Sequence, residues 1–201
     1  MKKISLKKDI ILAGVGGQGI LSIASVIDWA ALKMGLNIKQ AEVHGMSQRG
    51  GSVQSHLRIS DQIIYSDLIS KKSADLIISV EPLEALRYLS FLKDTGWVVT
   101  SNNTFKNIDN YPADEKLKDE LDKLPKKVIL DADKIARSCG SLKTSNMVLL
   151  GASSEFIGIE SELLKKGIRT LFSSKGEELI EMNLKAFETG KSIQRDTKIT
   201  A

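Results

Sequence analysis

Apolar residues along the chain fall into short continuous runs near the N-terminus and into helical spacing between and after them. Residues 10–13 form one such run, and short runs of this kind suit strands that a parallel sheet buries on both faces. Residues 20–34 carry apolar side chains at helical spacing, and Gly35 follows them as a glycine commonly follows a helix. Residues 38–43 resemble a second strand. The pattern therefore predicts a strand–glycine loop–helix–strand unit, which begins an α/β domain.

The middle of the chain predicts further short strands, at residues 53–59, 76–80, 97–100 and 128–130. Residues 63–65 could pair back on the first of these as a hairpin. Pro82 stands at a plausible first helical position, and a helix over residues 83–92 should follow it. Residues 102–127 are polar and rich in lysine, which predicts loops and one exposed helix.

The last third of the chain is predicted to be mostly helical. Ser145 could cap a helix over residues 146–156. Helices over 161–172 and 175–189 should follow, with Gly190 ending the last of them. We expect a single domain over residues 1–190 and a loose polar tail over residues 191–201. The predicted fold is α/β, with a Rossmann-like, mostly parallel sheet flanked by helices and a helical C-terminal part.

The bulk composition suits one globular domain and argues against binding to nucleic acid. The chain has 201 residues, of which 42% are hydrophobic and 27% charged, and its net charge is +4. Nucleic-acid binders usually concentrate their charge and interleave aromatic residues with it. Aromatic residues make up only 5% of this chain, so we expect no nucleic-acid partner. Anionic small ligands or an acidic protein surface remain possible partners.

The chain has one cysteine, Cys139, which cannot by itself support a disulfide framework, a zinc site or an iron–sulfur cluster. The apolar run at residues 10–13 is shorter than the core of a signal peptide, and a glycine loop follows it at once. No segment approaches the ~20 apolar residues of a membrane helix. We therefore expect a soluble, cytoplasmic protein with no membrane partner.

Gly14, Gly16 and Gly19 fit the pattern G-x-G-x-x-G between a strand and a helix. In a dinucleotide site the first glycine allows a tight turn, the second admits a phosphate and the third allows close helix–strand packing. Glu42 stands where such a site carries an acidic residue for the ribose. If residues 44–51 fold over the first loop, they would fill or reshape a nucleotide pocket. The plain alternative is a tight strand–helix turn with no ligand.

A second glycine segment lies in the stretch EVHGMSQRGGSV, residues 42–53. Gly50 and Gly51 permit unusual backbone angles and a close approach to another surface. Arg49 carries a planar fork of donors that suits phosphate or carboxylate. The alternative is an ordinary surface turn with a solvated arginine.

No catalytic constellation is visible in the sequence. We find no nucleophile–base pair for covalent catalysis and no cluster of metal ligands. His56 and Cys139 are expected to be packed side chains, and Asp131 and Asp133 to be turn or cap residues. A Rossmann-like unit without such a constellation suggests a subunit whose chemistry lies partly in another chain.

The motifs GVGGQGI at residues 14–20 and EVHGMSQRGGSV at 42–53 resemble the gamma-type subunits of the 2-oxoacid:ferredoxin oxidoreductases. Within that family, the form HGMSQRGG is most similar to the beta subunits of the indolepyruvate oxidoreductases. Further matches are ADLIISVEPLEAL at 74–86, NMVLLG at 146–151 and NLKAFETG at 183–190. These motifs extend over nearly the whole chain in the expected order.

The resemblance implies a subunit of an enzyme that decarboxylates a 2-oxoacid, here indolepyruvate or another aryl pyruvate, and forms an acyl-CoA and carbon dioxide. Thiamine diphosphate and iron–sulfur clusters would belong to a larger catalytic alpha subunit, and electrons would pass to ferredoxin. CoA would be a co-substrate. The alternatives are a stand-alone nucleotide-dependent reductase and a nucleotide sensor on a Rossmann scaffold.

We expect residues 46–51 to pack beside the first glycine loop and to complete a surface at the subunit junction. Arg49 would engage an anionic group there, a CoA phosphate or a carboxylate of the partner. The residues predicted to bind a cofactor are Gly14, Gly16, Gly17, Gln18, Gly19, Ser47, Arg49, Gly50 and Gly51.

Overall fold

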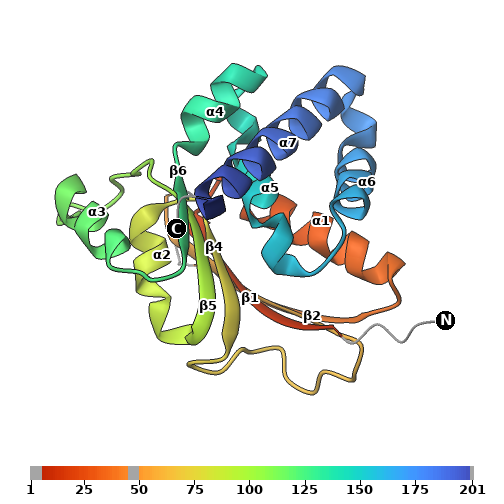
Figure 1. The fold of residues 1–201 in the computed structure, drawn as a ribbon, viewed down its shortest axis with the longest axis horizontal. Helices are drawn as coiled ribbons and strands as arrows, with labels where there is room; N and C mark the ends of the chain where they lie inside the picture. The colour runs from red at the N-terminus through yellow and green to blue at the C-terminus, as the bar shows by residue number, and fades with distance from the viewer. Residues whose placement is uncertain (1–5, 45–49, 200–201) are drawn as a thin grey trace.

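The structure, a computed structural model, describes residues 6–44 and 50–199 and contains a six-stranded sheet with helices on both faces (Figure 1). The strands are β1 (Lys7–Val15), β2 (Asn37–His44), β3 (Ser52–Ser60), β4 (Ala74–Ser79), β5 (Leu92–Ser101) and β6 (Lys127–Leu130). Their order across the sheet is β2-β3-β1-β4-β5-β6. The four adjacent strands β1, β4, β5 and β6 are parallel to one another. In contrast, β3 is antiparallel to both β1 and β2. The predicted α/β class is confirmed, and one reversed strand makes the sheet mixed.

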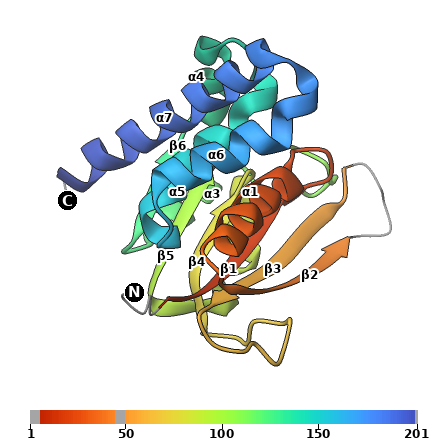
Figure 2. The ribbon, with the colours of Figure 1, turned by 90° about the vertical axis from the view of Figure 1, so that its right-hand side faces the viewer.

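The helices divide between the two faces of the sheet (Figure 1). One face carries α1 (Ile20–Lys33), α4 (Ala132–Cys139), α5 (Ser145–Ile157), α6 (Ser161–Phe172) and α7 (Glu177–Ile199). The other face carries α2 (Pro82–Arg87) and α3 (Asp114–Asp122). Short 3₁₀ helices occupy Leu89–Phe91, Leu142–Thr144 and Ser173–Lys175. Figure 2 shows α6 and α7 as an outer layer, separated from the sheet by α1 and α5.

The central strand β1 explains why its sequence is a continuous apolar run. Ile10, Ile11 and Leu12 are all fully buried. Ile10 and Leu12 pack in the core beneath α1 and α5, whereas Ile11 and Ala13 pack in a second core beneath α2. Because helices cover both faces, every position from Ile10 to Ala13 is apolar.

The last helix differs from its prediction at the C-terminal end. Gly190 does not stop α7, which continues to Ile199, so the loose tail expected after residue 190 was wrong. A Cβ atom at Gly190 would lie 2.0 Å from the carbonyl oxygen of Val148 on α5. A Cβ atom at Gly151 would lie 1.9 Å from the carbonyl oxygen of Phe187 on α7. These two glycines therefore let the backbones of α5 and α7 touch. The limit of the domain at residue 190 stays a prediction.

Two other predicted elements were wrong for reasons of long-range pairing. The helix expected over 83–92 ends at Arg87, because Leu92 already pairs with Ala74 as part of β5. Residues 63–65 form no strand, since the side chain of Arg58 holds the following segment through the carbonyls of Ser66 and Leu68.

The start of α5 also differs slightly from its prediction. Ser145 lies inside the first turn of α5 rather than capping it, and Thr144 occupies the N-cap position. The hydroxyl of Thr144 donates to the carbonyl oxygen of Ser141 and makes no side-chain cap.

Candidate functional site

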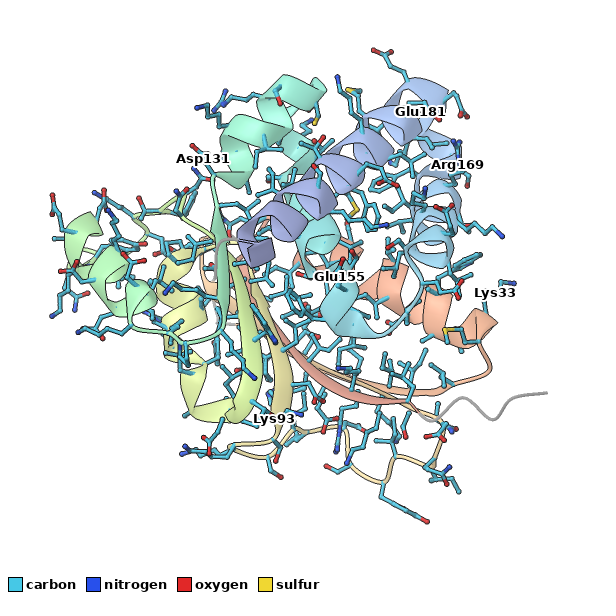
Figure 3. The ribbon with its side chains drawn as sticks, in the orientation of Figure 1. Lys33, Lys93, Asp131, Glu155, Arg169 and Glu181 are labelled. Carbon is cyan, nitrogen blue, oxygen red and sulfur yellow. The ribbon has the colours of Figure 1, made fainter. Side chains whose placement is uncertain are left out.

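The carboxyl ends of the parallel strands meet at one edge of the sheet and frame a cleft. Figure 3 shows Asp131 at this edge, just beyond β6, and Lys93 toward the opposite edge. The chain leaves β1 into α1 on one face and leaves β4 into α2 on the other face (Figure 1). Ligands of open α/β sheets bind at such a topological switch point. The cleft has a volume of about 530 Å³, and its lining includes Gly17, Gln18, Gly19, Val80, Asn103, Thr104, Phe105, Asp133, Lys143 and Asn146.

The first glycine loop is held closed by its own glutamine. Gln18 Oε1 accepts a hydrogen bond from the backbone N–H of Val15, at 2.8 Å. Gly17 has a φ angle of +98°, which glycine adopts readily and other residues resist. The dinucleotide pattern predicts that Gly14 forms the tight turn. Gly14 instead lies inside β1. A Cβ atom at Gly14 would lie 2.2 Å from Cγ2 of Val80, so its role is close packing against the end of β4.

Gly19 ends the loop and receives a side chain from α5. It adopts a φ angle of +78°, and a Cβ atom there would lie 2.6 Å from Nδ2 of Asn146. Asn146 Nδ2 donates to the carbonyl oxygen of Gly19 at 3.1 Å, and Asn146 is only 5% exposed. The third glycine therefore admits a helix from far along the chain rather than bringing α1 close to a strand. Asn146 begins the motif NMVLLG, residues 146–151, but the sequence pattern predicted no role for it.

The second glycine segment meets the first through a backbone hydrogen bond. The N–H of Gly16 donates to the carbonyl oxygen of Gly51 at 2.9 Å. Gly50 has a φ angle of +77°, and its carbonyl oxygen accepts from Nδ2 of Asn107 at 2.6 Å. We call Gly16, Gly50 and Gly51 the glycine junction. Ser47 and Arg49 lie outside the described residues, so their place beside the junction stays a prediction.

The arrangement does not match a dinucleotide site. In that fold the second strand lies beside the first and brings its acidic residue to the ribose. Here β3 lies between β1 and β2, with Ser55 paired to both Leu12 and Glu42. Glu42 is thereby displaced from β1 by two strand spacings, roughly 10 Å. The amide of Gly16, which would face a phosphate, already donates to Gly51.

A polar cluster missed by sequence reasoning forms the wall of the cleft near α4. Asn103 Nδ2 donates to Asp131 Oδ1, and the N–H of Asp133 donates to Asn103 Oδ1, both at 2.9 Å. Asp131 also caps α4 by accepting from the N–H of Lys134 at 2.9 Å, which confirms its predicted cap role. The hydrogen bond from Asn103 and the capping bond lower the pKa of Asp131. Burial raises the pKa of Asp133.

Two buried glutamates at the start of α2 were also missed. Glu81 is 1% exposed and caps α2 by accepting from the N–H of Glu84 at 2.8 Å. Glu84 is 2% exposed, and its Oε2 accepts from the hydroxyl of Ser52 at 2.5 Å. Burial raises the pKa of Glu84, and the bond from Ser52 opposes that rise. The one sequence signal was their position in the VEPLEAL motif after a strand.

His56 and Cys139 are packed side chains, as expected. His56 is 3% exposed, its Nδ1 accepts from the N–H of Ile69 at 3.0 Å, and its ring packs edge-on against Phe91. Burial, and to a lesser extent Arg58, lowers the pKa of His56. Cys139 is buried on α4.

Residues 6–44 and 50–199 contain no group of three or more His, Cys, Asp or Glu side chains that could hold a metal ion. None of the helices in this same part of the chain is long and apolar enough to span a bilayer.

Comparison with known proteins links this fold to one family. Residues 9–193 match the pyruvate ferredoxin/flavodoxin oxidoreductase family. The chain is 38% identical over 192 residues to the indolepyruvate oxidoreductase subunit IorB of Thermococcus kodakarensis, covering 90% of this chain and 93% of that subunit.

Two solved structures share the fold. The 2-oxoglutarate:ferredoxin oxidoreductase from Magnetococcus marinus superposes with a TM-score of 0.76 at 24% identity, over 94% of this chain and 31% of that longer chain. The pyruvate oxidoreductase subunit PORC from Thermotoga maritima superposes with a TM-score of 0.71 at 20% identity, over 92% of this chain and 96% of that subunit.

Proposed function

Because the chain belongs to the pyruvate ferredoxin/flavodoxin oxidoreductase family and is a subunit of an oxidoreductase of the 2-oxoacid:ferredoxin type, we propose that its complex oxidises indolepyruvate or another aryl pyruvate. The 2-oxoacid and CoA would give an arylacetyl-CoA and carbon dioxide, and the two electrons would pass to ferredoxin. The 38% identity to an indolepyruvate oxidoreductase subunit over most of both chains supports this substrate class.

The cofactors of the reaction are proposed to lie in a larger catalytic subunit. An iron–sulfur cluster takes cysteine thiolates as ligands, and Cys139 is the single, buried cysteine of this chain. The two buried carboxylates are engaged by the protein itself: Glu84 accepts from the hydroxyl of Ser52, and Glu81 accepts from the N–H of Glu84 and the hydroxyl of Tyr111. The chain is therefore proposed to be inactive alone and to act in the cytoplasm as a complex with its partner.

Within the complex, the glycine junction is proposed to form the surface that this chain presents to CoA or to its partner. The supporting observation is the hydrogen bond from Gly16 to Gly51, which joins two distant glycine segments directly beside Gly17, a residue that lines the cleft. Small residues there leave room for another backbone or a phosphate to approach. Arg49 is proposed to bind the anion, and Gly17, Gln18, Gly19 and Ser47 are proposed to complete the site. Gly14 would contribute from within β1, through the close packing that shapes the start of the loop.

Replacement of Arg49 tests this role. Loss of a charge-assisted hydrogen bond costs about 1.5–3 kcal/mol, so Arg49→Ala should lower kcat/KM for CoA in the assembled complex by about tenfold or more. The stability of the isolated chain should not change. Arg169→Ala is a matched control, because Arg169 is an exposed arginine on α6 that pairs with Glu177 and Glu181. Normal turnover and normal CoA dependence in Arg49→Ala would contradict the proposal.

Assembly is tested by anaerobic affinity purification from the native cell. A large co-purifying subunit that contains iron and thiamine diphosphate, and that oxidises aryl pyruvates only with this chain present, is the expected result. Recovery of this chain alone, free of both cofactors, would instead favour a stand-alone reductase or sensor.

A further inference from the structure

The two buried glutamates of α2 contact the segments that form the cleft without lining the cleft themselves. Glu81 and Glu84 are 1% and 2% exposed, and neither belongs to the lining of the cleft. A carboxylate this deeply buried destabilises the fold unless hydrogen bonds compensate for lost water. The groups that donate those hydrogen bonds are therefore held in fixed positions. The segments that contain these donors are the segments that the two glutamates orient.

Glu84 holds the beginning of β3. The hydroxyl of Ser52 donates to Glu84 Oε2 at 2.5 Å and lies 3.1 Å from the hydroxyl of Tyr88. Arg87 Nη1 lies 3.3 Å from the other carboxylate oxygen of Glu84. Ser52 directly follows Gly51, whose carbonyl oxygen accepts the hydrogen bond from Gly16. The carboxylate of Glu84 thus fixes the residue next to the glycine junction.

Glu81 holds the opposite segment, residues 102–113 between β5 and α3. The hydroxyl of Tyr111 donates to Glu81 Oε1, and the N–H of Phe105 lies 3.5 Å from the same oxygen. Phe105 lines the cleft and is 46% exposed. Asn107 in the same segment donates to the carbonyl oxygen of Gly50 at 2.6 Å. Glu81 therefore orients both a wall of the cleft and a contact of the junction.

We propose that Glu81 and Glu84 are positioning residues, which set the glycine junction and the Phe105 wall of the cleft from behind the sheet. Sites are precise when rigid elements and a supporting layer of hydrogen bonds hold the residues that act. Here one helical turn of α2 supports both neighbouring segments. The geometric part of this inference stands alone, whereas its effect on CoA rests on the proposed function.

The geometric part is tested by amide hydrogen exchange of Gly16 in the full chain, normalised to the core amides of β1. Ser52→Ala and Glu84→Ala each remove the bond between the two residues. Exchange of Gly16 should become about tenfold faster in both, the equivalent of one lost hydrogen bond. Glu84→Gln keeps an acceptor oxygen and should restore slow exchange. Tyr88→Phe keeps the Ser52–Glu84 bond and should match the natural chain.

The functional part is tested in the assembled complex with the same variants. Ser52→Ala and Glu84→Ala should raise KM for CoA about tenfold with little change in kcat, and Glu84→Gln should recover the natural KM. Arg58→Ala is the structural control, since it destabilises the opposite edge of the sheet and should leave KM unchanged. A merely structural role for Glu84 would lower stability without this separation of KM from kcat.

The outcomes separate this inference from the proposed function. Unchanged Gly16 exchange in both Ser52→Ala and Glu84→Ala overturns the positioning role. Faster exchange with normal KM, while Arg49→Ala raises KM, overturns the link to CoA and leaves the proposed function standing. Faster exchange with normal KM in all variants, Arg49→Ala included, also overturns the proposed contact of Arg49 with CoA, whereas the oxidation of aryl pyruvates by the complex is decided by the purification experiment.

Discussion

The contact between α5 and α7 gives a sharp prediction, because two glycines there face backbone rather than side chains. In Gly151→Ala the new Cβ atom would lie 1.9 Å from the carbonyl oxygen of Phe187, and no rotamer change can relieve that overlap. The helices must separate by roughly 1.5 Å to restore ordinary contact, in a core packed at crystal-like density. Overpacking costs about 1–3 kcal/mol, with a backbone clash at or above the upper end. The better helix propensity of alanine returns up to ~1 kcal/mol.

We therefore expect Gly151→Ala to lower the free energy of unfolding by about 2 kcal/mol or more, and Tm by about 4–8 °C. Urea denaturation of the isolated chain measures this loss. Gly190→Ala should behave alike, since its Cβ atom would lie 2.0 Å from the carbonyl oxygen of Val148. The double variant should cost less than the two losses combined, because separating the helices once relieves both clashes.

Gly167 provides a graded control for this reasoning. A Cβ atom at Gly167 on α6 would meet Val26 and Trp29 at 3.1 to 3.3 Å, which small shifts can accommodate. Gly167→Ala should therefore change stability much less than Gly151→Ala. If Gly151→Ala proves as stable as the natural chain, or more stable, helix propensity outweighs the backbone contact and the argument fails.

Three further predictions concern single residues. Burial raises the pKa of Asp28 to about 6. Between about pH 4 and about pH 6 the folded chain therefore keeps a proton on Asp28 that the unfolded chain has lost, and the free energy of unfolding falls as the pH rises through that window. Asp28→Asn should abolish that fall and raise the unfolding free energy at pH 7 by about 1–2 kcal/mol, allowing for partial exposure; an unaltered pH profile of urea unfolding would refute this. Arg58→Ala should cost about 3 kcal/mol or more in urea unfolding, because it leaves the 4%-exposed Asp9 without the guanidinium at 2.8 Å, and a loss below 1 kcal/mol would contradict it. Gly19→Ala should cost more in thermal unfolding than Gly176→Ala, since both have positive φ but only Gly19 faces Asn146, at 2.6 Å; equal losses would show that the contact is irrelevant.

Local sequence patterns predicted those elements whose cause is local. The strand β1, the glycine loop and α1 follow from an apolar run, backbone-permissive glycines and helical spacing that ends at Gly35. The helix expected over residues 161–172 matches α6 (Ser161–Phe172). Asp131 as a cap and His56 as a packed side chain were also confirmed, because each depends on a short stretch of chain and the burial of one strand.

The candidate site was predicted only in part. The sequence pointed to both glycine segments, and the structure joins them through Gly16 and Gly51. It gave no reason to select Asn103, Asn146 or Glu84, whose hydrogen-bond partners lie 28, 127 and 32 residues away along the chain. A polar residue acquires such a role from what the fold brings beside it, and periodicity carries no information about that partner.

The sequence by itself determined the α/β class, the glycine loop between β1 and α1, and the family resemblance, because these depend on residue types at short spacing. Tertiary structure alone decided that β3 lies between β1 and β2, which takes Glu42 away from the first loop. It also decided that Gly190 serves a helix–helix contact rather than a helix end. The physical reason is the same in both cases. Strand pairing and backbone contact depend on which distant segments pack together, and the identity of a glycine or an acidic residue does not specify the segment that will lie against it.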